Sequence, residues 1–297
     1  MLAAFAAVYI IWGSTYLGIR FAIETMPPFL MGGARFLLAG GILYVWLRRK
    51  GEATPTSSDW MNAVVVGTLL LGMGNGGVNW AETKIASSTV ALIIAVTPVW
   101  FALFDWLRPG GKRPTPRTVI GILIGFAGMV LLVGNPVQGA SLVREHPVHL
   151  GVVIWASIAW AVGSLYSRYT PKPKPPLMGV ALQMLAGGTV LSVLGVATGE
   201  SDAFSVARIS ARSGLAFIYL TLIGSLVGFT AYSWLLKVST PAKVSTYAYV
   251  NPVIAVFLGW AFAGETLTPR MLAAAGIIIL GVVIISAPRL AVLVDKP

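Results

Sequence analysis

Long apolar runs, each close to twenty residues, follow one another along this chain with short polar breaks between them. Their length matches the ~20 residues that a helix needs to cross a bilayer core at ~1.5 Å per residue. The runs are continuous, whereas the strands of a membrane barrel alternate over about ten residues, so helices are favoured. We therefore expect an all-α integral membrane protein with ten transmembrane helices, at residues 3–23, 29–47, 60–80, 86–106, 117–134, 149–168, 176–198, 213–236, 240–262 and 269–288.

Two of the predicted spans carry a proline near the middle. Pro98 interrupts 86–106 and Pro252 interrupts 240–262, and the two prolines are 154 residues apart. A proline inside a helix removes a donor and frees the carbonyl four residues earlier, which is that of Ile94 in the first span. Such a carbonyl is costly in hydrocarbon unless it faces protein, water or a ligand. We expect Pro98 and Pro252 to act as hinges beside a site at mid-depth, with simple kinks as the alternative.

Related spacings recur along the whole chain and indicate an internal duplication. Trp12 and Trp160 are 148 residues apart, and the Leu-Ala-Gly-Gly sequence at 38–41 returns at 185–188. Each copy holds five predicted spans, an odd number, so the second copy must enter the membrane upside down. Inverted repeats are typical of transporters that alternate between two open states. The chain is therefore predicted to form one membrane domain, 1–297. Residues 1–135 form the first five-helix repeat, and residues 148–290 form the second, inverted five-helix repeat.

The composition agrees with a membrane protein and removes several kinds of chemistry. Of the 297 residues, 57% are hydrophobic and 10% are charged, whereas soluble domains carry roughly a quarter of charged residues. The chain has no cysteine, so disulfides, thiolate catalysis and cysteine-bound metal are excluded. No nucleophile–base pair, carboxylate pair or metal cluster falls inside a predicted span. We therefore expect no catalytic residues, no metal, no cofactor and no enzyme activity.

The net charge of +11 follows the topology of the chain. If the N-terminus is cytoplasmic, the inner loops hold fourteen of the 21 basic residues and the outer loops hold six, with Arg35 inside a span. Such an excess agrees with the positive-inside rule, so both termini are expected in the cytoplasm. The lipid bilayer then accounts for the basic surplus, and nucleic acid is not expected as a partner.

Polar and aromatic side chains recur at helical spacing in several spans. Side chains four residues apart share a helix face, so such sets can line a cavity for a small-molecule substrate. Trp12 and Trp160 lie in mid-span, where interfacial anchoring does not suit them, so they line a cavity or pack between helices. The asparagines could instead join helices by hydrogen bonds. The predicted substrate-binding residues are Trp12, Tyr16, Asn75, Asn79, Thr97, Trp160, Ser164, Tyr232, Tyr247 and Asn251.

Charged residues within the spans are few and expensive. Arg35 costs about 2.5 kcal/mol or more at a helix centre, and it could reach the outer surface, pair with Glu24 or bind a substrate carboxylate. Acidic residues are absent from the central third of every predicted span, and Glu82 lies at a span end. Proton-coupled carriers commonly use a membrane-embedded carboxylate. A facilitator or a weakly coupled exporter is therefore the simpler expectation.

Short motifs run through the chain in a fixed order. They are Ile11-Trp12-Gly13-Ser14-Thr15, Pro27-Pro28 with Arg35-Phe36, Asn251-Pro252, and Gly264-Glu265 with Gly276 and Gly281. Their order and spacing resemble the drug/metabolite transporter superfamily, and within it the EamA family of ten-helix exporters. The first repeat departs from this pattern, because it has no Gly-Glu before its last span. The resemblance implies a monomeric carrier with a central cavity in the bacterial inner membrane, which exports amino acids or other small metabolites.

The predicted function is that of a secondary transporter. It exports small amphiphilic metabolites, amino acids foremost, by alternating access through a central mid-membrane cavity. An indole or phenol wall suits an apolar side chain, while amides and freed carbonyls suit ammonium and carboxylate groups. The alternatives are an importer, a carrier of other small organic solutes or drugs, and a non-transporting membrane assembly protein.

Overall fold

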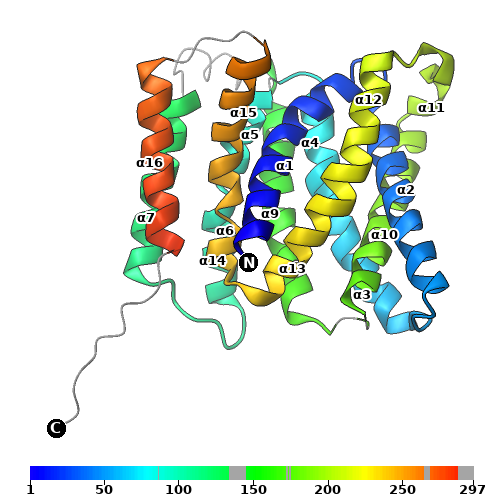
Figure 1. Ribbon diagram of the computed structural model, residues 1–297, viewed down its shortest axis with the longest axis horizontal. Helices are drawn as coiled ribbons and strands as arrows, with labels where there is room; N and C mark the ends of the chain where they lie inside the picture. The colour runs from blue at the N-terminus through cyan, green and yellow to red at the C-terminus, as the bar shows by residue number, and fades with distance from the viewer. Residues whose placement is uncertain (86, 134–144, 172, 174, 264–267, 287–297) are drawn as a thin grey trace.

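The computed structural model describes residues 1–85, 87–133, 145–171, 173, 175–263 and 268–286. Across these residues the chain is helical, with no strand. The long helices stand side by side in one bundle, and the N-terminus lies at its lower end in Figure 1. The segment 136–147, between the two predicted repeats, lies largely outside the described residues, and the Gly264-Glu265 motif lies wholly outside them.

Every predicted span coincides with a helix, a continuous rod of helices or a divided pair. Among the described residues, seven rods are long and apolar enough to cross a membrane. They are α1 (Leu2–Ala22), α2 (Pro28–Arg49), the α3–η1–α4 rod (Ser57–Ala81), α9 (Pro147–Tyr169), α10 (Pro176–Ala197), the α12–η3–α13 rod (Ala211–Val238) and α16 (Pro269–Ser286). The apolar stretch Pro116–Leu132 of α7 (Pro116–Val133) is shorter than these seven. The all-helical membrane architecture is thus confirmed, whereas ten spans in two inverted repeats stays a prediction.

The fourth predicted span, 86–106, is divided at its proline. Two residues separate the end of α5 (Ser87–Ile94) from the start of α6 (Thr97–Leu107). Pro98 is the second residue of α6, where its fixed φ suits the first turn of a helix and its missing donor costs nothing. The proline therefore starts a new helix rather than bending a continuous one.

The ninth predicted span, 240–262, is divided at a different place. The short helix α14 (Pro241–Val244) precedes α15 (Tyr247–Ala263), and Thr240 caps α14 by accepting from the amide of Lys243. Pro252 lies inside α15, several residues after the division. The two prolines therefore match in sequence position but not in their local structure.

Two of the rods contain a stretch of π-helix. The first rod consists of α3 (Ser57–Gly67), η1 (Thr68–Asn75) and α4 (Gly76–Ala81), and the second of α12 (Ala211–Tyr219), η3 (Leu220–Phe229) and α13 (Thr230–Val238). The π-stretches η1 and η3 each form the middle of their rod. Such stretches are rare and occur frequently at functional sites. The short helices α11 (Glu200–Ala203) and η2 (Val206–Arg208) lie between α10 and the second rod.

Helices from the two halves of the chain pack directly on each other. α2 packs against α10 and α7 packs against α16, and these two pairs lie on opposite sides of the bundle in Figure 1. Glycines permit the close approach, because a Cβ at Gly40 would lie 2.9 Å from the carbonyl oxygen of Ala181. A Cβ at Gly121 would likewise lie 3.0 Å from the carbonyl oxygen of Gly281. A larger side chain at either glycine would force the helices apart.

The first helix of each half lies between these outer pairs (Figure 1). α1 packs against α15, α12 and η3, which all belong to the second half. α9 packs against η1, α4 and α6, which all belong to the first half. Because the first helix of each half packs against the other half, Trp12 of α1 and Trp160 of α9 lie at the centre of the bundle.

Candidate functional site: a central cavity

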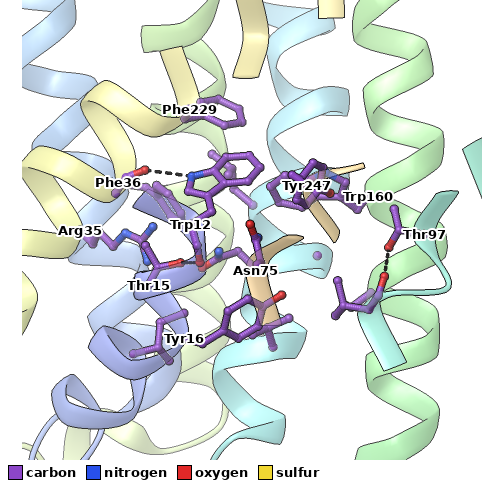
Figure 2. Close-up of a pocket in the computed structure, with 18 residues that line it drawn as sticks. Trp12, Thr15, Tyr16, Arg35, Phe36, Asn75, Thr97, Trp160, Phe229 and Tyr247 are labelled. Atoms are coloured by element: carbon purple, nitrogen blue, oxygen red, sulfur yellow. Dashed lines mark hydrogen bonds between the residues drawn. The ribbon is translucent and has the colours of Figure 1, made fainter. Parts of the chain in front are cut away.

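A cavity of about 70 Å³ lies in the middle of the bundle, and Figure 2 shows the side chains around it. On this measure one water molecule takes ~10–15 Å³, so the cavity suits a small solute. The first half of the chain contributes α1, α2, η1, α4, α5 and α6 to the wall. The second half contributes α9, η3 and α15, so both halves enclose the same space.

Most of the predicted substrate-binding residues lie in this wall. The seven that line the cavity are Trp12, Tyr16, Asn75, Thr97, Trp160, Tyr247 and Asn251. They come from five different helical segments of both halves, which the helix-face pattern alone could not bring together. Their contact with a substrate stays a prediction, and their common location makes that prediction testable.

Three predicted residues are buried outside the cavity wall. The hydroxyl of Tyr232 lies 2.6 Å from Oγ of Ser164 and accepts a hydrogen bond from Nε1 of Trp160 at 2.9 Å. These two side chains therefore hold Trp160 in position. Nδ2 of Asn79 donates to the carbonyl oxygen of Pro28 at 3.3 Å, so Asn79 joins α4 to α2.

Four rings, those of Trp12, Trp160, Tyr232 and Tyr247, form an aromatic cluster at the cavity. The ring centroid of Trp12 lies 5.4 Å from that of Trp160, 4.8 Å from that of Tyr232 and 5.2 Å from that of Tyr247. Nε1 of Trp12 also donates to the carbonyl oxygen of Gly224 at 3.3 Å. Because such aromatic pairs contribute ~0.5–1.5 kcal/mol each, the cluster holds Trp12 firmly. Trp12 therefore lines the cavity and packs between helices at the same time.

Each tryptophan of the cluster lies against a glycine of the other half of the chain. A Cβ at Gly228 would lie 2.6 Å from Nε1 of Trp12, and a Cβ at Gly74 would lie 2.8 Å from Cε3 of Trp160. The glycines are 154 residues apart and the tryptophans are 148 apart. The two contacts therefore correspond position by position, and both need a residue without a side chain.

The carbonyl that Pro98 frees is satisfied within its own segment. Oγ1 of Thr97 donates to the carbonyl oxygen of Ile94 at 2.5 Å, a bond that is dashed in Figure 2. Thr97 reaches this oxygen because it lies three residues further along the chain. The freed carbonyl therefore already accepts one hydrogen bond, and its contact with a ligand stays a prediction, because a carbonyl oxygen has a second lone pair and both Ile94 and Thr97 line the cavity.

The amide of Asn251 makes comparable contacts with the backbone. In the orientation that suits its neighbours, the amide nitrogen donates to the carbonyl oxygens of Tyr247 at 3.0 Å and of Tyr9 at 3.3 Å. Both amide protons are then engaged. The amide oxygen of Asn251 is the group left for a ligand, and it accepts hydrogen bonds.

Arg35 also lines the cavity and is only 3% exposed. Its Nε donates to Oγ of Ser225 at 2.7 Å, while its Nη1 is buried without a hydrogen-bond partner. Arg35 does not reach the surface, and Glu24 instead lies 3.5 Å from Nη1 of Arg212. The sequence left three possibilities open for Arg35, and two of them, a position at the outer surface and an ion pair with Glu24, are therefore wrong. Oδ1 of Asn75 is a second polar atom of this wall that is buried without a partner.

The wall also contains residues that the sequence pattern did not select. Among them are Thr15, Phe36, Gly74, Gly224 and Phe229. Thr15 adjoins a selected residue, and Gly74 shares the 154-residue spacing with Gly228, so both carried a usable signal. Phe36 follows Arg35 in one of the quoted motifs, whereas Phe229 carried no signal, because an apolar residue in an apolar span looks the same whether it faces lipid or a cavity.

Comparison with known proteins identifies the class. The model of the EamA-like transporter family matches residues 1–134 and 149–287, so the chain belongs to this family and is a membrane transporter. The family resemblance inferred from the motifs is thereby confirmed.

Individual relatives agree with this assignment. The uncharacterized inner membrane transporter YedA of Escherichia coli (strain K12) is 37% identical, over 96% of this chain and 90% of its own. The uncharacterized transporter YvbV of Bacillus subtilis (strain 168) is 24% identical, over 95% of this chain and 90% of its own. A solved crystal structure matches 96% of both chains with a TM-score of 0.75 at 20% identity, which shows a shared fold.

Proposed function

We propose that this protein is a secondary transporter that exports small amphiphilic metabolites, with amino acids as the preferred class. The observation that carries the proposal is a small central cavity, enclosed by both halves and bordered by the aromatic cluster. The indole and phenol surfaces suit an apolar side chain. The amide oxygens of Asn75 and Asn251 are acceptors that suit an ammonium group. The proposed activity requires no covalent step.

We propose that transport proceeds by alternating access between two inverted five-helix repeats. The family model matches the chain in two segments that follow the predicted repeats. Hydrogen bonds recur at the spacings of the duplication, since Arg20 donates to the carbonyl oxygen of Glu82 and Arg168 donates to that of Leu236. Inverted halves provide two related states, open to opposite sides, when they exchange shapes.

The proposed setting is the bacterial inner membrane, with both termini in the cytoplasm. The loops at 50–56 and 108–115 lie at the same end of the bundle as the N-terminus (Figure 1), and this is the end with the basic surplus. The relative YedA is named an inner membrane transporter, which supports the same location. The proposed working unit is a monomer, because the cavity is enclosed by elements of one chain.

Reconstitution into liposomes tests the proposed function. Purified protein should exchange labelled amino acids across the bilayer faster than protein-free vesicles. The panel also contains small organic solutes and drugs, so flux limited to those compounds would keep the carrier and refute the amino-acid class. Absence of flux across the whole panel would favour the assembly role. An outward gradient in cells that overproduce the protein distinguishes export from import.

A further inference from the structure

The guanidinium of Arg35 is held in a fixed position at the cavity wall. Its Nε donates to Oγ of Ser225, and that hydroxyl donates in turn to the carbonyl oxygen of Leu220 in η3. A Cβ at Gly224, which lines the cavity, would lie 3.5 Å from Nη2 of Arg35. Figure 2 shows the Arg35 side chain beside Thr15 at the edge of the cavity. The guanidinium of Arg35 therefore lies between Ser225 on one side and the cavity on the other.

The positive charge of Arg35 has no acidic partner in the described part of the chain. Ion pairs there join Arg108 to Asp105 and Arg212 to Glu24. Glu82 is also fully buried, but both of its carboxyl oxygens lack a hydrogen-bond partner, so it does not bond to Arg35. A guanidinium keeps its charge in proteins, and a buried charge is costly unless it is paired. The missing partner of Arg35 is therefore an anion.

We propose that Arg35 binds the carboxylate of the transported solute, so that the cavity selects cargo with an anionic group. This inference rests on the proposed transport function and names the chemistry of its cargo. The guanidinium fork matches the planar geometry of a carboxylate, and Nη1 is the donor left without a partner. The apolar part of the cargo then lies towards the aromatic cluster, which borders the same space.

The second repeat has no counterpart of the Arg35 guanidinium, so the two halves of the chain contribute differently to the site. The counterpart of Arg35 at a spacing of 148 residues is Gln183 on α10, which is buried but is not part of the cavity wall. The cation that binds the carboxylate therefore comes from the first half of the chain. Replacing Arg35 with glutamine gives the first half the residue that the second half already has.

Matched pairs of probes test the proposal. Binding of L-leucine, L-phenylalanine and L-threonine to the purified full-length protein is measured by titration calorimetry, alongside binding of their carboxamides. Each amino acid should bind at least about tenfold more tightly than its carboxamide, since a charge-assisted hydrogen bond is lost in the amide. Arg35→Gln should reduce this ratio to about one. Arg49→Gln removes an exposed guanidinium from the same helix and should leave the ratio unchanged.

The ratio separates a binding role from a structural one. A structural role for Arg35 would weaken the acids and the amides equally, and an unchanged ratio in Arg35→Gln overturns the proposal. If that variant does not fold, equal affinity for acids and amides in the wild-type protein overturns it just as well. Tighter binding of aminophosphonate analogues than of the acids would refute the carboxylate and identify a phosphate-type anion. If the protein bound the acids more tightly than the amides but showed no liposome flux, the transport function would be contradicted and the assignment of Arg35 as a carboxylate-binding residue would stand.

Discussion

Gly228→Ala tests whether the aromatic cluster sets the shape of the cavity. The new Cβ would lie 2.6 Å from Nε1 and 3.0 Å from Cδ1 of Trp12, whereas ordinary contacts begin near 3.4 Å. The indole must therefore move by roughly 1 Å, although rings of the cluster surround it. Overpacking of this kind costs ~1–3 kcal/mol, and loss of the Trp12–Gly224 hydrogen bond costs ~0.5–1.5 kcal/mol. The better helix propensity of alanine offsets up to ~1 kcal/mol.

The net expectation is a loss of about 1–3 kcal/mol in the free energy of unfolding together with lower transport. A thermal denaturation curve in detergent should show a Tm lower by several degrees, since a loss of ~1 kcal/mol lowers the Tm of a chain of roughly this length by ~2–4 °C. Liposome flux should fall as well, because the displaced ring enters the cavity. Gly74→Ala, which meets Cε3 of Trp160 at 2.8 Å, should give a similar result.

Gly276→Ala on α16 is the matched control, because a Cβ there would meet nothing within 4 Å. It should keep the wild-type flux, and its Tm should stay at the wild-type value or rise, because alanine favours a helix over glycine. If Gly228→Ala also kept both values, Trp12 would not be held at the cavity as described. A lower Tm with normal flux would separate packing from function and would refute the role of the cluster in transport.

Three further predictions follow from the buried polar groups. Asn251→Ala should lower liposome flux several-fold, because its amide both lines the cavity and holds two backbone carbonyls. Thr97→Val should lower the free energy of unfolding by ~1–2 kcal/mol, read as a lower Tm, because the carbonyl oxygen of Ile94 loses its donor. Burial raises the pKa of Glu82, just past the end of α4, well above 4.5, and the charge of Arg20 opposes this shift. The folded state then binds this proton more tightly than the unfolded state, so stability should fall as the pH rises above the ordinary pKa of a glutamate, and Glu82→Gln should flatten that slope in Tm.

Two of these predictions have a control variant in the chain. Thr97→Ser keeps the hydroxyl and should retain the wild-type Tm. Asp202→Asn removes an exposed carboxylate and should leave the pH slope unchanged. Normal flux in Asn251→Ala would remove Asn251 from the site, and a wild-type pH slope in Glu82→Gln would show that another group titrates.

The helices of this protein follow closely from its hydropathy, because the thickness of the bilayer dictates the length of each apolar run. The predicted span at 29–47 lies within α2, which begins at a proline in its first turn. The π-stretches η1 and η3 were not predicted, because they have no hydrophobic period of their own. The division before α15 was also missed, since Pro252 was the visible breaker and the chain instead separates at Ser245 and Thr246.

The candidate site was predictable as far as helix faces determine it. Periodicity selects residues that share a face, but it does not tell whether another ring stands in front of them. Tyr232 illustrates this, because it lies on a selected face and is screened by its contact with Trp160. Arg35 was recognised as an expensive residue, yet its partner Ser225 is 190 residues away and could not be found from the sequence.

The wide turns of η1 and η3 have a mechanical consequence. A π-turn pairs residues five apart and an α-turn pairs residues four apart, so rewinding one into the other rotates everything beyond it about the helix axis. Asn75 is the last residue of η1, and Gly228 is one from the end of η3. A local change of winding would therefore swing the amide of Asn75, or withdraw the surface that supports Trp12.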